Sequence, residues 1–423
     1  MLKCKRRNQR QRKKRKLKDG QGDFAMDWAG LPRDILVMIF EKLSLVDCMS
    51  VDSVCKQWSN ILAELPNWKR GGFPWLLMSG QKDREMRTCA SVLDNQSWEM
   101  ELLEAYGAYV WGSFQDWLIL VKDLGCYSLE VSLLNPFSTK RINLPNLWNF
   151  YHKMALSGSP AEENTICAAI HSQNREIAFW IQGSKVWHKY RLEGTPFEDA
   201  IFCSGSLFLL CNDGNIFQFD ATSIVSNIRE DENATSISEI KAQFHEVRSL
   251  EINSQHVLKY LVDSSGEVLL VCRYYSEKPD AIRETINFEI YSLDLGQMSW
   301  EKVDYLDDRI LFLGKCCSRS LSSSELGIGI SNRIYFSNDD VAPWWNEWDS
   351  NHLKGLSSFF GLDNSSRKDW GAFHIDSDMN GNFCFRGNRD NWAPTWFTAP
   401  LWWYSKNIAR QTNRYRYRYR HNL

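Results

Sequence analysis

The sequence lacks the short signatures of the common enzyme classes. It contains no GxSxG nucleophile elbow, no Walker-type glycine loop, no HExxH pair and no CxxC pair. Its eight histidines are scattered without the close spacing that a metal site needs. These absences argue against serine-hydrolase, P-loop nucleotide and zinc chemistry. The sequence therefore predicts no catalytic residue, no metal and no cofactor.

Long hydrophobic runs are also lacking. No apolar stretch approaches the ~20 residues of a membrane-spanning helix, and no apolar segment of a secretory signal follows the basic N-terminus. Twelve cysteines are spread from Cys4 to Cys384, and in a chain of this size we expect them to behave as small buried hydrophobic residues. We therefore expect a protein of a reducing compartment, in the nucleus, the cytoplasm or both, with no membrane partner.

The whole chain has almost no net charge, because its 50 Lys and Arg residues nearly balance its 52 Asp and Glu residues, for a formal charge of −2. Residues 1–18, however, carry eleven basic residues, residues 410–423 carry five arginines, and neither stretch has an acid. The body between them has a charge of −18, with 34 basic residues against 52 acidic ones. This acidic body argues against nucleic acid as its main ligand and favours basic protein targets.

The basic run near the N-terminus is dense enough for nuclear import or for contact with nucleic acid. Its candidate import residues are Lys5, Arg6, Arg7, Arg12, Lys13, Lys14, Arg15 and Lys16. A solvated arm without a specific role is the alternative. The C-terminal RYRYRYR alternates cations with stacking rings, a composition that can bind RNA or single strands, and an unconstrained tail is the alternative.

By composition and periodicity the chain divides into five zones. These are a disordered basic tail at 1–22, helices at 27–65, a linker region at 66–99, a β domain at 100–404 and a basic Arg/Tyr tail at 405–423.

The helical zone has one apolar stripe. Pro32 suits a first helical turn, and the carboxylate of Asp34 favours a helix N-terminus. Apolar residues then recur at three- and four-residue steps, at Leu31, Ile35, Leu36, Ile39, Phe40 and Leu43. Two further short helices follow, and Pro66 ends the last one. Three short helices bury little apolar area on their own, so part of this surface must face something else.

The β zone repeats one local design, in which two runs of alternating or β-branched residues flank a turn. Asp213-Gly214 and Ser265-Gly266 lie where tight hairpin turns are expected. Many short strands over about 300 residues predict either a β-propeller of about six or seven blades or a large sandwich. Two loops interrupt the pattern, an acidic one at 229–240 and a Ser-rich one at 318–324.

Two features near the C-terminus have both a structural and a functional interpretation. Asp376, Asp378, Asn380 and Gly381 match the start of a calcium loop, but Gly387 occupies the position that requires a bidentate Glu. A hairpin turn is the simpler interpretation. The second feature is a group of tryptophans, which either pack between sheets or form an exposed rim for a protein partner. They are Trp344, Trp345, Trp348, Trp370, Trp392, Trp396, Trp402 and Trp403.

The helical zone resembles an F-box. The resemblance rests on the Leu31-Pro32 start, the apolar stripe, Asp47 and the Val54-Cys55-Lys56-x-Trp58 ending, in the order and spacing of that family. A generic three-helix cap on the β domain would not predict this start and this ending together. The helices of the F-box family dock on a small Skp-type adaptor, which joins them to a cullin–RING ubiquitin ligase. The resemblance implies an adaptor interface at Leu31, Pro32, Ile35, Leu36, Ile39, Val54, Cys55 and Trp58.

The rest of the chain resembles the plant F-box proteins with a degenerate C-terminal β-propeller, a group once classed as a domain of unknown function. The segments LLNPFSTKRINLP (133–145), FEIYSLDLGQMSWEKVDYLDDRILFLG (288–314), GIGISNRIYFSNDD (327–340) and WAPTWFTAP (392–400) follow the family's order. The resemblance implies a mainly β protein with a small α domain, in which an N-terminal three-helix F-box precedes a β-propeller.

The function that this resemblance implies is that of a non-catalytic substrate receptor in an SCF-type ubiquitin ligase. The F-box would bind the adaptor, and the β domain would bind a protein target whose identity the sequence does not specify. A nuclear nucleic-acid-binding or structural protein that uses the two basic tails is the alternative.

Overall fold

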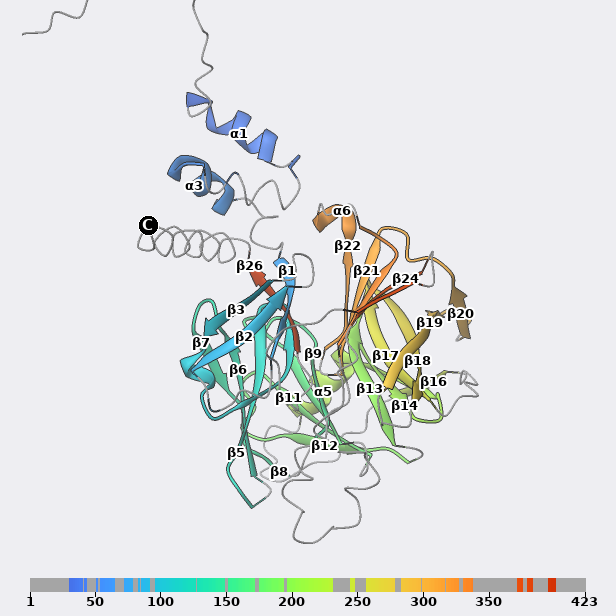
Figure 1. Cartoon of the computed structure of the whole chain (residues 1–423). Coiled ribbons are helices and arrows are strands. Elements are labelled where there is room, and N and C mark those ends of the chain that lie inside the picture. Colours follow the sequence, from blue (N-terminus) through green and yellow to red (C-terminus); the bar gives the residue numbers. More distant parts are fainter. Residues whose placement is uncertain are drawn as a thin grey trace, which may run out of the picture.

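The computed structural model describes residues 30–40, 42–43, 51, 54–64, 72–78, 83, 85–91, 96–126, 128–148, 151–171, 175–193, 196–230, 244–247, 256–277, 283–297, 299–315, 317–326, 330–337, 371–375, 379–382 and 395–400. The predicted basic tails at 1–22 and 405–423 lie outside these residues, as do 231–240 of the acidic stretch. The described part consists of two helices near the N-terminus and a ring of β-sheets (Figure 1).

Six sheets form the ring, and we call them blades 1 to 6. The domain is therefore a six-bladed β-propeller, in agreement with the lower of the two predicted blade numbers, and it is not a sandwich. From the innermost strand outward, the first three blades are as follows. Blade 1 contains β26 (Thr395–Pro400), β1 (Gly72–Leu77), β2 (Met86–Ser91) and β3 (Gln96–Glu101). Blade 2 contains β4 (Tyr109–Phe114), β5 (Trp117–Asp123), β6 (Ser128–Asn135) and β7 (Lys140–Asn143), and the short strand β8 (Leu147–Trp148) also pairs with β6. Blade 3 contains β9 (Lys153–Leu156), β10 (Ile166–His171), β11 (Glu176–Ile181) and β12 (His188–Arg191).

The other three blades continue around the ring. Blade 4 contains β13 (Phe197–Cys203), β14 (Ser206–Cys211), β15 (Ile216–Asp220) and β16 (Phe244–Val247); blade 5 contains β17 (Val257–Ser264), β18 (Glu267–Glu277), β19 (Arg283–Asp294) and β20 (Ser299–Val303); blade 6 contains β22 (Arg319–Ser322), β21 (Arg309–Leu313), β23 (Arg333–Phe336), β24 (Gly371–His374) and β25 (Met379–Asn382). The helices are α1 (Arg33–Phe40), α3 (Lys56–Glu64), η2 (Leu103–Ala105), α5 (Ala221–Glu230) and α6 (Ser323–Leu326). No described helix is both long and apolar enough to cross a membrane.

Both faces of most inner and middle strands are buried, because each blade packs against a neighbour on either side. All six residues of β11 and all six of β14 are buried. A strand covered on both faces has a continuous apolar run instead of strict alternation. This explains why the repeat looks degenerate in the sequence, although its hairpins are regular.

The predicted hairpin turns are confirmed. Ser265 and Gly266 join β17 to β18 as a two-residue loop in which both residues have positive φ, 56° and 89°. Such a turn matches the right-handed twist of the two strands, and glycine is preferred in it because it has no Cβ. Gly214 has a φ of 87° between β14 and β15.

Closure of the ring joins the two ends of the propeller sequence in blade 1. The C-terminal strand β26 pairs antiparallel with β1, from Gly72 opposite Pro400 to Leu77 opposite Thr395. The stretch 66–99, interpreted as a linker region, therefore contains β1, β2 and the start of β3, and the propeller begins at Gly72 instead of residue 100. The interpretation failed because the partner strand of β1 lies at the other end of the chain.

Blade 6 has an irregular strand order. The chain enters through β21, turns into the innermost strand β22, and later adds β23 parallel to β21. Residues 319–322, which we expected to lie in a Ser-rich loop, are thus a strand that faces the centre of the ring, and α6 follows them. The small hydroxyl side chains suit this position because neighbouring inner strands approach closely there.

The C-terminal aromatic residues that the structure describes are packed inside. Trp396 of β26 is buried, its ring centroid lies 5.2 Å from that of Phe312, and its indole N–H donates a 2.9 Å hydrogen bond to the carbonyl of Leu313. It therefore connects blade 1 to blade 6. For this tryptophan the packing interpretation is confirmed, and the other seven lie outside the described residues.

Most of the cysteines that the structure describes are buried, as predicted: Cys89, Cys167, Cys203, Cys211, Cys272 and Cys317. The candidate calcium loop is a hairpin, because β24 pairs with β25 from His374 opposite Met379 onward. Asp376 and Asp378 lie outside the described residues.

Replacing Trp396 by Ala should lower the free energy of unfolding by about 3–5 kcal/mol, because the change leaves a cavity where the ring closes. Trp148→Ala, which truncates an exposed tryptophan, should cost much less. Chemical denaturation of both variants checks this difference. Equal loss in the two variants would contradict the role of Trp396 in closure.

Candidate protein-interaction surface

The two described N-terminal helices have one buried face and one exposed face. Leu36 and Phe40 of α1 and Ile61 and Leu62 of α3 are buried, and they belong to one continuous cluster with side chains of blades 1 and 2. Leu36, for instance, is only 1% exposed. Large apolar side chains between 38% and 60% exposed lie elsewhere on this helical unit, on α1 at Ile35, Met38 and Ile39 and in the turn before α3 at Val54. We call these four residues the exposed helix face.

Local contacts set this arrangement. The backbone N–H of Leu36 donates to the carbonyl of Pro32 at 3.2 Å, which starts α1 at the predicted point. Arg33 of α1 forms an exposed ion pair with Glu64 at the end of α3, which adds little to the packing of the two helices. Between them, Phe40 meets the edge of Trp58 with ring centroids 5.6 Å apart.

The eight residues predicted at the adaptor interface fall into two groups. Four of them are exposed and available to a partner: Pro32 and the three residues Ile35, Ile39 and Val54 of the exposed helix face. Leu31, Cys55 and Trp58 are partly buried and Leu36 is fully buried, so these four support the face from inside. Their role in binding stays a prediction.

Met38 is exposed on the same face but was not among the predicted residues. The helical period would have identified it, because Met38 follows Ile35 by three residues. Of the three predicted helices, the structure describes the first and the third; residues 44–50 and 52–53, where the second is expected, lie outside it, as do the eight candidate import residues.

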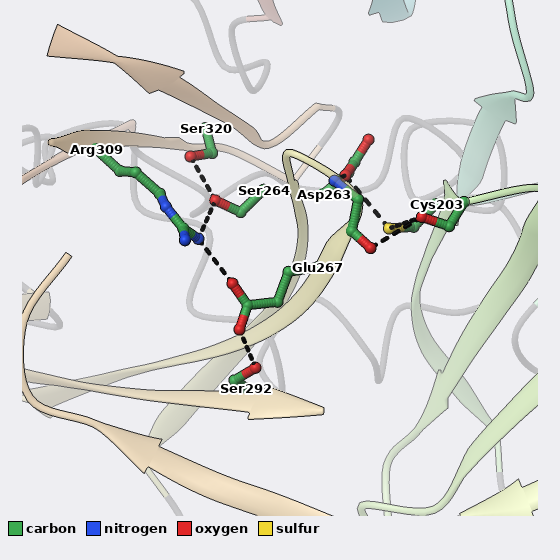
Figure 2. Close-up of polar contacts among 9 residues, drawn as sticks. Cys203, Asp263, Ser264, Glu267, Ser292, Arg309 and Ser320 are labelled. Atoms are coloured by element: carbon green, nitrogen blue, oxygen red, sulfur yellow. Dashed lines mark hydrogen bonds and ion pairs between the residues drawn. The ribbon is translucent and has the colours of Figure 1, made fainter. Parts of the chain in front are cut away.

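The second candidate site is polar. It lies at the rim of the central ring, where the hairpin turns of blades 4 and 5 meet blade 6 (Figure 2). We call this site the rim cluster. The guanidinium of Arg309 donates to Ser264 Oγ at 2.9 Å and to Glu267 Oε2 at 2.8 Å. Ser264 in turn donates to Ser320 Oγ at 2.8 Å, and Ser292 donates to Glu267. These contacts tie β17 and β18 to β21 and β22.

Cys203 completes the rim cluster from blade 4. Its thiol donates to Asp263 Oδ1 at 3.3 Å, and the same oxygen accepts the Gly266 N–H at 2.9 Å. Burial, together with the charge and hydrogen bond of Asp263, raises the pKa of Cys203 to about 12. A thiol that stays protonated is a poor nucleophile. The geometry therefore favours a structural contact between blades over a reactive cysteine.

The carboxylate of Glu267 is held in its charged form. Burial alone would raise its pKa, but hydrogen bonds from Ser292 and Arg309, with the charge of Arg309, outweigh burial and lower it. Among the residues that the structure describes, no group of three or more His, Cys, Asp or Glu side chains could hold a metal ion.

Two family models match the chain. Residues 89–374 match the model described as KIB1-4 beta-propeller, and residues 28–73 match the model described as F-box-like. The second match covers α1 and α3 with the exposed helix face and ends within β1. The first covers blades 2 to 5 completely and most of the strands of blade 6.

The curated relatives that the chain resembles are named as F-box proteins. The chain is 26% identical over 351 residues to the putative F-box protein At2g33200 of Arabidopsis thaliana, covering 75% of this chain and 87% of the relative. It is 22% identical over 354 residues to the F-box protein SKIP23 of the same plant, covering 71% and 81%. Among solved structures, a BBS1N chain crystallised with ARL6DN and soaked with lead covers 51% of this chain and 60% of its own length, with 10% identity. Its TM-score of 0.30 is too low to add to the description of the fold.

Glu267→Gln should destabilise the protein at neutral pH, because it removes a carboxylate whose folded-state pKa lies below its usual value. The stability from this group is present above the unfolded pKa of ~4.3 and is lost as pH falls through the lower folded value. The gap between wild type and variant should therefore shrink below about pH 4. Urea midpoints measured from neutral to acid pH check this, with the exposed Glu101→Gln as control. A gap that stays constant with pH would contradict it.

Proposed function

The chain belongs to the KIB1-4 β-propeller family and is a plant F-box protein, and from this premise we propose that it is a substrate receptor of an SCF-type ubiquitin ligase. An F-box followed by a propeller supports a receptor role in general. The finer proposal is that the F-box binds a Skp-type adaptor, that the adaptor joins a cullin–RING ligase, and that the propeller holds a protein target.

The exposed helix face is the single observation that carries the proposal. Ile35, Met38, Ile39 and Val54 expose large apolar side chains within the region that matches the F-box-like model. An apolar patch on so small a helical unit is costly in water unless a partner covers it. The adaptor is that partner in this proposal, and Leu36 and Trp58 stiffen the patch from inside.

The mechanism is proximity, and the receptor does no bond chemistry of its own. Holding the target and the charged ubiquitin-conjugating enzyme in one assembly raises the effective concentration of target lysines at the reacting thioester. The protonated Cys203 is consistent with a chain that supplies binding surfaces. Import through the basic run at Lys5–Lys16 would place this activity in the nucleus as well as the cytoplasm, which is likewise a proposal.

A direct test is to co-purify the full chain from plant cells with the proteasome and cullin activation blocked. The adaptor and a cullin should be recovered together with it. A chain recovered at normal yield without either protein would contradict the proposal. Salt-dependent RNA or DNA binding that is lost on deleting residues 1–18 and 410–423 would favour the nuclear alternative instead.

A double variant, Ile35→Ser with Met38→Ser, should weaken adaptor binding at least about tenfold, because both side chains lose apolar area at the interface. Titration of a recombinant Skp-type adaptor into each purified chain measures this.

Ile286→Ser with Tyr305→Ser is a matched control, because both residues are at least as exposed but belong to blade 5 and the loop after it. The control should bind as the wild type does. Unchanged affinity in the helix variant, with an unchanged propeller melting transition, would place the adaptor elsewhere.

A further inference from the structure

Exposed large apolar side chains are not spread evenly over the described surface. Besides the four of the exposed helix face, three lie in or next to blade 5. The remaining five lie on blades 1 and 2, and we call them the apolar ridge: Met86, Leu103, Tyr106, Leu124 and Trp148. Each is between 40% and 59% exposed.

Strand pairing brings the five residues of the apolar ridge together. Met86 lies opposite Glu101 at the end of the β2–β3 pair. The N–H of Leu102 donates to the Glu85 carbonyl at 2.7 Å, so the pairing continues to the residue before Leu103. Gly107, next to Tyr106, lies against the side chain of Lys122. These contacts join η2 to both blades.

The second half of the ridge follows along blade 2. Leu124 follows Lys122 by two residues, and its N–H donates to the Ser128 carbonyl at 3.0 Å. Ser128 is the pairing partner of Trp148 in β8. The five residues therefore lie at the same end of blades 1 and 2, although Met86 and Trp148 are 62 residues apart in the sequence.

The ridge lies at the end of the propeller away from the helices. The helical region runs into β1 at Gly72, opposite Pro400, whereas the other end of β1, Leu77, lies opposite Thr395. Met86 and Glu101 are found beyond Leu77 in the same sheet, so they share that far end. In Figure 1, α1 and α3 lie on the side where β1 and β26 are labelled, whereas β8, which contains Trp148, lies toward the opposite end.

The border of the ridge is acidic. Glu85, Glu101 and Glu104 are exposed, and none of the three takes part in an ion pair among the described residues. Arg141, which reaches the Glu104 carbonyl, is paired with Glu130 at 3.0 Å. Lys122 and the buried Arg87, which donates to the carbonyls of Ala105 and Ala108, add two positive charges against the three glutamates and Asp123. The local excess is negative, in line with the −18 of the whole body.

We propose that the apolar ridge is the surface that holds the target protein, and that it takes a segment with large apolar side chains flanked by Lys or Arg. This inference rests on the proposed receptor function and names the site and chemistry of its target. Tyr, Trp and Met are enriched at the centres of protein interfaces, where they supply most of the binding energy. The acidic border adds specificity, since basic flanks are attracted and acidic ones repelled.

A short fluorescent peptide, in which Leu and Trp are spaced by Lys and Arg, is the probe for binding to the full chain. Fluorescence anisotropy should show saturable binding. One comparison peptide has Glu in place of each Lys and Arg, and another has Ser in place of each Leu and Trp. Each should bind at least about tenfold more weakly.

Tyr106→Ser with Trp148→Ser should reduce binding of the basic apolar peptide at least about tenfold. The equally exposed pair Ile286→Ser with Tyr305→Ser should leave it unchanged. Equal loss in both double variants, tight binding of the Ser peptide, or no binding of the basic apolar peptide to the wild type would overturn the proposal. Self-association of the chain that the ridge variant abolishes would also overturn it, because the ridge would then join two copies.

Adaptor affinity, measured on the same preparations, separates this proposal from the receptor function on which it rests. A ridge variant that binds adaptor normally and loses the peptide supports both. A chain that binds no adaptor undermines the receptor function, whatever the peptide result. Normal adaptor binding with no effect of the ridge variant on the peptide overturns the ridge alone.

Discussion

The propeller depends on the pairing of β1 with β26. The propeller is a ring of separate sheets, and without β26 blade 1 would lack its innermost strand and would leave the inner edge of β1 unpaired. Here six residues of the C-terminal strand complete blade 1, from Gly72–Pro400 to Leu77–Thr395. Trp396 then reaches across to blade 6 with both a ring contact and a hydrogen bond. Closure therefore combines backbone pairing, burial and one directed polar contact.

Polar contacts between inner strands hold the other blades in register. The buried pair Lys153–Asp199, at 2.7 Å, joins blade 3 to blade 4, and Asp199 also accepts the Leu261 N–H of blade 5 at 2.8 Å. The rim cluster does the same between blades 5 and 6. Removing one partner of the buried Lys153–Asp199 pair would leave an uncompensated buried charge, which strongly destabilises a protein.

The part of the fold that local chemistry controls could be predicted from the sequence. The period of the apolar stripe predicted α1 from Pro32 onward, and Ser265-Gly266 predicted its hairpin because only a few residues accept positive φ. The F-box-like match at 28–73 and the propeller match at 89–374 confirm the two-part organisation. Burial within the helices was less predictable, since the same stripe contributes Leu36 to the inside and Ile35 to the surface.

By itself the sequence determined the element types, the hairpins and the helical face, because each depends on residues within one or two turns of chain. Tertiary structure alone decided that β1 pairs with β26, that Arg319–Ser322 is an inner strand, and that the residues of the apolar ridge lie at one end of blades 1 and 2. These features arise from pairing between residues far apart in the chain. Their energy depends on which strands meet in the closed ring, and no local pattern records that choice.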